Sequence, residues 1–134
     1  MCLFPPEHSQ KEILKKVTLV LGASSNPERI AYHAIINLQR RKVPVVAIGR
    51  KEDSIGDLRI RKGMPGDVGP VHTISMYMNA ANQAEFYDYI FSLKPVRIIF
   101  NPGTFNPELS LMAMNMGIEV VEDCMLVMLR TRKF

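Results

Sequence analysis

The sequence contains no tryptophan, few other aromatic residues and no long apolar run, and each shortage argues against a class of protein. Aromatic residues make up 7% of the chain, whereas surfaces that bind nucleic acid place aromatic side chains among their cations. No apolar stretch reaches the roughly 18 residues that a membrane-spanning helix needs. We therefore expect a protein that binds neither nucleic acid nor a membrane.

Cysteine is scarce as well, because only Cys2 and Cys124 occur, at opposite ends of the chain. Such a pair makes no disulfide framework, which favours a reducing compartment. In place of the apolar core of an export signal, the first residues carry a Ser9-x-x-Glu12 pattern, which is typical of a helix start. We therefore expect a cytoplasmic protein.

The length and composition limit the number of domains. With 134 residues, of which 47% are hydrophobic, the chain can bury one core but cannot hold a cofactor domain and a separate substrate domain. We expect an arm and a short helix over residues 1–16, followed by one domain over residues 17–134. The net charge of +4 lies in short basic clusters that are typical of solvated helix ends, so it favours anionic ligands only weakly.

Apolar runs alternate with segments of helical periodicity along the chain. Runs that are apolar on both faces are typical of parallel strands covered by helices. The sequence therefore predicts an α/β fold, namely a single-domain, Rossmann-like open parallel sheet of about five strands with helices on both faces. Residues 49–70, rich in glycine, predict a long loop with one short strand near residues 58–60. The five main strands are expected at Val17–Leu21, Pro44–Ile48, Val71–Met78, Val96–Phe100 and Ile118–Val121.

Helical periodicity also predicts which side chains the later helices bury. In the helix that starts near residue 107, we expect Leu109, Met112, Ala113 and Met116 to face the sheet. Residues 130–134 are expected to form a polar tail.

Ligands of open parallel sheets bind beyond the carboxyl ends of the strands, where the strand order switches. The loops that follow Leu21, Ile48, Met78 and Phe100 are therefore expected to surround one site. The loop after the third main strand offers Asn79, Asn82 and Gln83, which can cap the next helix or face a ligand.

The first loop, "GASSNPER", turns sharply from a strand into a helix. Gly22 matches the tight-turn glycine of a dinucleotide fingerprint, but Ser24 and Pro27 occupy its second and third glycine positions. Ser25 or Asn26 can cap the helix, and the free amides of the first turn then favour an anion. An ordinary capped turn explains the same residues, so this loop alone leaves both interpretations open.

The second loop indicates what kind of anion is bound. An NAD site places a carboxylate here to bind the ribose hydroxyls, whereas Gly49 is followed by Arg50 and Lys51. Two cations suit a phosphorylated ribose, as in NADP or coenzyme A. The alternative is that Glu52 and Asp53 simply pair with them at the surface.

Three segments together resemble the small stand-alone coenzyme A-binding proteins, whose fold is that of the N-terminal domain of the succinyl-CoA synthetase alpha subunit. They are "GASSNPER", the basic pair in "IGRKED", and "FNPGTFNPEL" with "GIEVVEDCMLVML" behind it. The resemblance extends over about residues 17–131. It implies that Gly22, Ala23, Ser24, Ser25, Asn26 and Arg29 line a phosphate-binding loop, that Arg50 and Lys51 meet the phosphorylated adenosine, and that Asn101, Pro102, Gly103 and Thr104 border the pantetheine or pyrophosphate.

The sequence departs from this family at the end of the second strand. Many relatives have Asn-Pro-Lys there, whereas this chain has Gly49-Arg50-Lys51. The basic charge is kept, but the proline that would pack against the adenine is missing.

The sequence offers no evident catalytic group. His8, His33 and His72 lack the spacing of a metal site, and no histidine is expected beside Cys124 to activate it. We therefore expect a protein that binds coenzyme A, as the free cofactor or as acyl-CoA, and we favour a binding protein over an enzyme.

Two alternatives remain from other classes. Arg50 and Lys51 also suit an NADP-binding, reductase-type protein. The other alternative is a regulatory or interaction module that binds no small ligand but contacts a protein partner or a second copy of itself. The interaction module is suggested by a set of methionines, although such residues usually fill gaps in a core. They are Met112, Met114, Met116, Met125 and Met128.

Overall fold

In the computed structural model, which describes residues 15–134, the apolar runs of the sequence form the strands of one sheet. The central strands are buried along almost their whole length, because helices cover both faces of the sheet. In chain order, the strands are β1 (Thr18–Ala23), β2 (Val45–Gly49), β3 (Asp53–Ile55), β4 (Leu58–Lys62), β5 (Thr73–Met76), β6 (Arg97–Phe100) and β7 (Glu119–Glu122).

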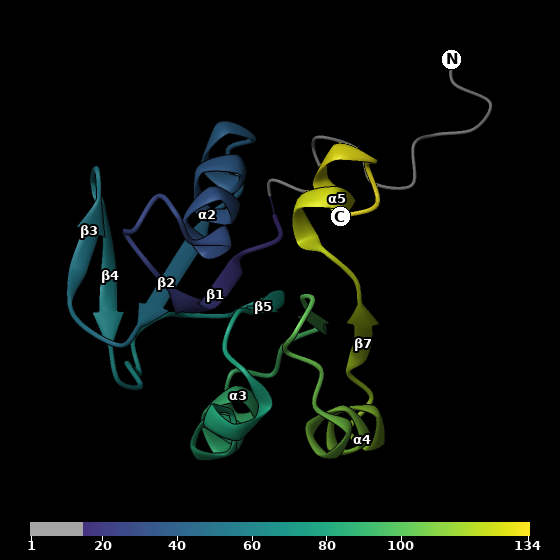
Figure 1. The fold of residues 1–134 in the computed structure, drawn as a ribbon. Coiled ribbons are helices and arrows are strands. Elements are labelled where there is room, and N and C mark those ends of the chain that lie inside the picture. Colours follow the sequence, from purple (N-terminus) through teal and green to yellow (C-terminus); the bar gives the residue numbers. More distant parts are fainter. Residues whose placement is uncertain (1–14) are drawn as a thin grey trace.

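The strand order is β3-β4-β2-β1-β5-β6-β7, and every pair is parallel except β3 with β4. The helices lie in two layers, one on each face, and each layer encloses its own apolar cluster (Figure 1). The α/β, Rossmann-like fold predicted from the sequence is confirmed. Helices α2 (Ile30–Arg40) and α5 (Met125–Arg130) form one layer; α3 (Tyr87–Ser92) and α4 (Pro107–Asn115) form the other, with two 3-10 helices, η1 (Ala80–Asn82) and η2 (Ala84–Phe86), leading into α3.

The sheet has seven strands, so the predicted number of about five was too low. The stretch expected to be a long loop contains the β3–β4 hairpin, in which only Ile55 and Ile60 are buried. The short strand predicted near residues 58–60 corresponds to β4, whereas β3 was not predicted. A strand with one buried side chain has a short apolar pattern, and the charged residues around β3 are typical of a loop. At the other end of the chain, the predicted arm and short helix lie almost wholly outside the described residues.

Helix α4 buries a narrower face than its periodicity predicts. Leu109, Ser110 and Ala113 are buried, whereas Met112 is 37% exposed and Met116 is 59% exposed. The expectation that both methionines face the sheet was therefore wrong. Helix α4 packs near the edge of the sheet beside β7, where few strands are available to cover a wide helix face.

Residues 130–134 are not the polar tail that the sequence suggested. The Phe134 side chain is only 1% exposed, and its ring centroid lies 4.4 Å from the Arg97 guanidinium carbon. Lys16 Nζ donates a hydrogen bond of 2.6 Å to the Phe134 carbonyl oxygen. Contacts with residues distant in sequence thus bury this aromatic ring, and local composition does not reveal them.

Gly49 ends β2 at a point where a side chain has no room. A Cβ atom on this residue would lie 2.5 Å from the Ala23 carbonyl oxygen and 2.8 Å from Ile60 Cγ2. We expect Gly49→Ala to lower the free energy of unfolding by about 1 to 3 kcal/mol, because the backbone must move to relieve the overlap. Urea denaturation measures this effect. Gly66→Ala is the matched control, since a Cβ on Gly66 meets nothing within 4 Å, and equal losses in the two variants would contradict the prediction.

Candidate functional site

The strand order switches between β1 and β5. From β1 the chain passes to β2 on one side, and β5 lies on the other side. This switch in strand order is the position at which open parallel sheets generally form a ligand crevice. Because β1, β2, β5 and β6 are parallel, the loops that follow them lie along one edge of the sheet. These are the loops from which the sequence predicted a shared site.

Gly22 allows the first loop to touch the third. It has a φ of +98°, and a Cβ here would lie 2.9 Å from the Tyr77 carbonyl carbon. The Tyr77 amide donates a 2.8 Å hydrogen bond to the Leu21 carbonyl oxygen. Glycine is therefore required where β1 ends against the backbone that follows β5.

Two side chains of the loop after β1 accept hydrogen bonds from backbone amides of the same loop. The Asn26 amide donates to Ser24 Oγ at 3.0 Å, and the Glu28 amide donates to Asn26 Oδ1 at 3.0 Å. Helix α2 begins after Arg29, whose side chain makes no capping hydrogen bond. The expectation that Ser25 or Asn26 caps α2 was therefore wrong, because the polar side chains stabilise turns within the loop instead.

Two contacts hold this loop from outside. The Ser25 hydroxyl donates to Asp53 Oδ2, which joins the loop to the start of β3. His33 Nε2 lies 2.7 Å from the Pro27 carbonyl oxygen and donates to it. The hydrogen bond from Ser25, together with one of 2.8 Å from the Ser54 amide, lowers the pKa of Asp53 below its ordinary value. Asp53 therefore carries its negative charge at neutral pH.

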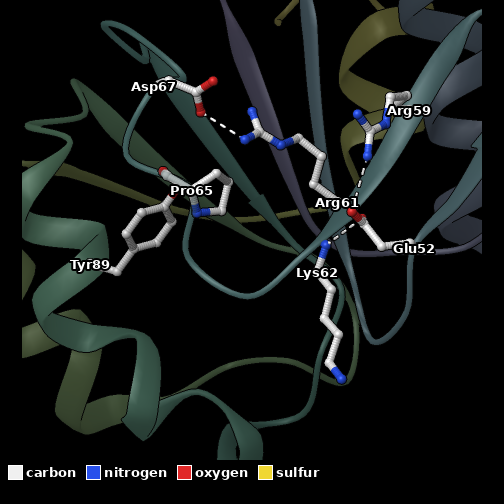
Figure 2. Close-up of polar contacts among 7 residues, drawn as sticks. All are labelled: Glu52, Arg59, Arg61, Lys62, Pro65, Asp67 and Tyr89. Carbon is white, nitrogen blue, oxygen red and sulfur yellow. Dashed lines mark hydrogen bonds and ion pairs between the residues drawn. The ribbon is translucent and has the colours of Figure 1, made fainter.

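The two carboxylates near the predicted cations are engaged elsewhere. Glu52 pairs with Arg59 at 3.1 Å and accepts the Lys62 amide at 2.9 Å (Figure 2). Between residues 15 and 134 the ion pairs are Arg59–Glu52 and Arg61–Asp67, so Arg50 and Lys51 belong to neither. Both cations are exposed. Neither cation forms an ion pair with Glu52 or Asp53, although Lys51 lies near enough to Asp53 to help lower the pKa of that carboxyl.

A third cation at this edge was missed from the sequence. Lys62, the last residue of β4, lies opposite Gly49 in the β2–β4 register. Its side chain is exposed and extends away from the Glu52 carboxylate (Figure 2). The sequence predicted a short strand near residues 58–60 but counted the basic cluster of residues 59–62 among the solvated helix ends. Alternation around Ile60 is the signal that could have extended that strand to Lys62.

Asn101, which follows β6, is 3% exposed and has its amide fully bonded. Its Nδ2 donates to Ser75 Oγ and to the Met76 carbonyl oxygen, each at 2.9 Å. Its Oδ1 accepts the Met125 amide at 2.8 Å. Thr104 Oγ1 donates to the Asn101 carbonyl oxygen at 2.7 Å. These two predicted site residues therefore position the loop, and their polar atoms are occupied within the protein.

Gln83 continues this buried network. Its Nε2 donates to the Met78 carbonyl oxygen at 2.9 Å and to that of Thr104 at 2.7 Å, and its Oε1 accepts Asn106 Nδ2 at 3.0 Å. From the sequence, Gln83 was expected to cap a helix or to face a ligand. In the structure, its side chain instead joins the loops that follow β5 and β6. Asn79 does cap η1, by accepting the Asn82 amide at 3.2 Å.

Pro102 and Gly103 are exposed on this same loop and border a pocket. The pocket has a volume of about 260 Å³ and lies between residues 100–105 and the end of β7, where Glu122 and Asp123 contribute to its rim. Of the four predicted residues 101–104, Asn101 and Thr104 are thus buried and position the loop, whereas Pro102 and Gly103 are exposed; Asn101 also contributes to the lining of the pocket.

The part of the chain that the structure describes contains no group of three histidine, cysteine or acidic side chains that could hold a metal ion. Among those same residues, no helix combines the length and apolarity needed to cross a bilayer.

Comparisons with known proteins agree with this fold. A protein-family model described as a CoA binding domain matches residues 16–130. A crystal structure of an uncharacterized protein is 41% identical, covers 89% of this chain and 98% of its own, and has a TM-score of 0.85. A Thermus thermophilus protein (21% identity, 89% and 90% covered, TM-score 0.79) and a hypothetical protein from Pyrococcus horikoshii (20%, 98% and 98%, 0.77) share the fold. No curated protein matches.

Proposed function

Because the chain belongs to the family of CoA-binding domains, we propose that it binds coenzyme A, free or as an acyl thioester, at the carboxyl edge of its sheet. The observation that carries this proposal is the set of exposed cations Arg50, Lys51 and Lys62, none of which takes part in the ion pairs formed between residues 15 and 134. A 3′-phosphate on the ribose is the group that such cations would select.

The rest of the cofactor would follow the edge of the sheet. In this proposal the phosphate-binding loop, residues 22–26 with Arg29, receives the pyrophosphate at the β1–β5 crevice. The pantetheine arm then passes Pro102 and Gly103, while Asn101 and Thr104 hold that loop in place. The chain lacks the proline that packs against the adenine in many relatives, so the phosphate contacts would supply much of the affinity.

We also propose that the chain binds its ligand in the cytoplasm without a catalytic group of its own. His72 precedes β5 and lies at the opposite edge of the sheet from the site. His33 is bonded to the backbone of the phosphate-binding loop. Neither histidine is thus placed to activate a nucleophile or transfer a proton at the crevice.

Titration calorimetry with coenzyme A, dephospho-coenzyme A and NADP tests the proposal. We expect coenzyme A to bind, and dephospho-coenzyme A to bind at least about tenfold more weakly because one charge-assisted contact is absent. Tighter binding of NADP would favour the reductase-type alternative, and no heat from any of the three would favour an interaction module and end the proposal.

Asp53 is expected to oppose ligand binding. Its carboxylate takes the hydroxyl of Ser25 and puts a negative charge beside the proposed phosphate positions. Asp53→Asn keeps an oxygen that can accept the Ser25 hydroxyl but removes the charge, so we expect coenzyme A to bind about twofold to tenfold more tightly. Calorimetry at low salt measures the change. Asp57→Asn, in the β3–β4 turn, is the control, and weaker binding by Asp53→Asn would show that this carboxylate contacts the ligand favourably.

A further inference from the structure

The pocket between the carboxyl ends of β6 and β7 has no part in the contacts proposed above for the nucleotide. Building on the proposed function, we propose that this pocket receives the acyl group of acyl-CoA, and that it selects a short, uncharged acyl chain. Its position, size, walls and charge each bear on this assignment.

The pocket lies where the end of the cofactor would arrive. In the strand order, β6 and β7 come directly after β5, so the pocket is about 10 Å from the β1–β5 crevice at the usual spacing of strands. The exposed Pro102 and Gly103 lie along the way. The pantetheine arm extends from the pyrophosphate through a long chain with amide groups, which would bring its sulfur to this end of the sheet.

The size and walls suit a small apolar group. A volume of about 260 Å³ corresponds to about eight groups as large as a water molecule, so it covers a short acyl chain but only part of a long fatty chain. Phe105 is 40% exposed, although it packs edge-to-face on Phe100 with their ring centroids 5.6 Å apart. Covering the open part of this ring would remove apolar surface from water.

The rim of the pocket is acidic. Glu122 and Asp123 are exposed, and neither takes part in the ion pairs formed between residues 15 and 134. The Cys124 amide donates to Asp123 Oδ1 at 2.7 Å. An acyl chain that ends in a carboxylate would therefore meet like charges.

Calorimetry with coenzyme A, butyryl-CoA and succinyl-CoA tests both features, because the two thioesters have equal carbon chains and differ in the terminal carboxylate. We expect butyryl-CoA to bind about threefold or more tighter than coenzyme A, and about tenfold tighter than succinyl-CoA. Failure of all three ligands to bind would refute the proposed function itself. Binding of coenzyme A without these preferences would refute only the acyl-group assignment.

Two sets of variants locate the effect. Glu122→Gln with Asp123→Asn keeps the shape and the acceptor for the Cys124 amide, and should bring succinyl-CoA within about twofold of butyryl-CoA. Glu119→Gln, at the other end of β7, should change nothing. Phe105→Ala should abolish the advantage of butyryl-CoA over coenzyme A, whereas Leu111→Ala, an exposed apolar residue on α4 outside the pocket, should preserve it. The proposal would be overturned if Glu122→Gln with Asp123→Asn left the preference for butyryl-CoA over succinyl-CoA unchanged and Phe105→Ala left the preference for butyryl-CoA over coenzyme A unchanged, with the thermal melting of both variants unaltered.

Discussion

Replacing Arg50 and Lys51 together by alanine is expected to weaken the binding of coenzyme A by about a hundredfold or more, while dephospho-coenzyme A changes by less than about threefold. Each charge-assisted contact is worth about 1.5 to 3 kcal/mol, and a loss of about 3 kcal/mol corresponds to more than a hundredfold. Dephospho-coenzyme A lacks the phosphate that these cations would hold. Calorimetry with both ligands on both proteins measures the difference.

The control for this double variant changes the net charge equally at a remote place. Arg130→Ala with Lys133→Ala removes two exposed cations at the end of α5, and should affect both ligands by less than about twofold at physiological salt, because screening limits distant charges. If the Arg50 and Lys51 variant weakens the two ligands equally, the 3′-phosphate does not lie at this pair. A remaining preference for coenzyme A in that variant would instead point to Lys62.

Asn101→Ala is expected to cost about 3 to 5 kcal/mol of the free energy of unfolding. The change removes three hydrogen bonds in a buried place and leaves the Met125 amide and the Met76 carbonyl oxygen without their partner. Each buried polar group left unsatisfied costs about 1 to 3 kcal/mol. Such a loss is a large part of the roughly 5 to 15 kcal/mol that stabilises a typical domain. Urea denaturation followed by circular dichroism measures it.

Asn79→Ala provides the comparison, because Asn79 is exposed and its side chain makes a single capping bond to the Asn82 amide. We expect this variant to lose about 1 kcal/mol or less. Similar losses in the two variants would mean that the network around Asn101 contributes little. Similar losses would also make a direct contact between Asn101 and the ligand a possible role for this side chain.

The parts of the fold that could be predicted are those in which local pattern and tertiary environment agree. β1, β5 and β6 are buried along almost their whole length and are largely apolar, because helices cover both of their faces. The basic pair that follows β2 could be recognised for the same reason, since the end of a buried strand marks the edge of the sheet. Only β4 of the β3–β4 hairpin was predicted, as a short strand near residues 58–60; β3 was missed because its exposed, charged residues resemble a loop.

The candidate site was only partly predictable, because several of its interactions join residues more than twenty positions apart. Ser25 bonds to Asp53, and Gln83 reaches both Thr104 and Asn106. No local pattern indicates such partners. The same holds for Lys62, which lies beside Gly49 only because β4 pairs with β2.

By itself, the sequence determined the alternation of strands and helices and the edge at which their loops meet, because hydrophobic periodicity depends on which faces are buried. Only the tertiary structure decided which polar side chains at that edge are free. Asn101 and Thr104 are bonded within the protein, while Arg50, Lys51 and Lys62 remain exposed. The physical reason is that a polar group's availability depends on its partners, and long-range packing alone brings those partners together.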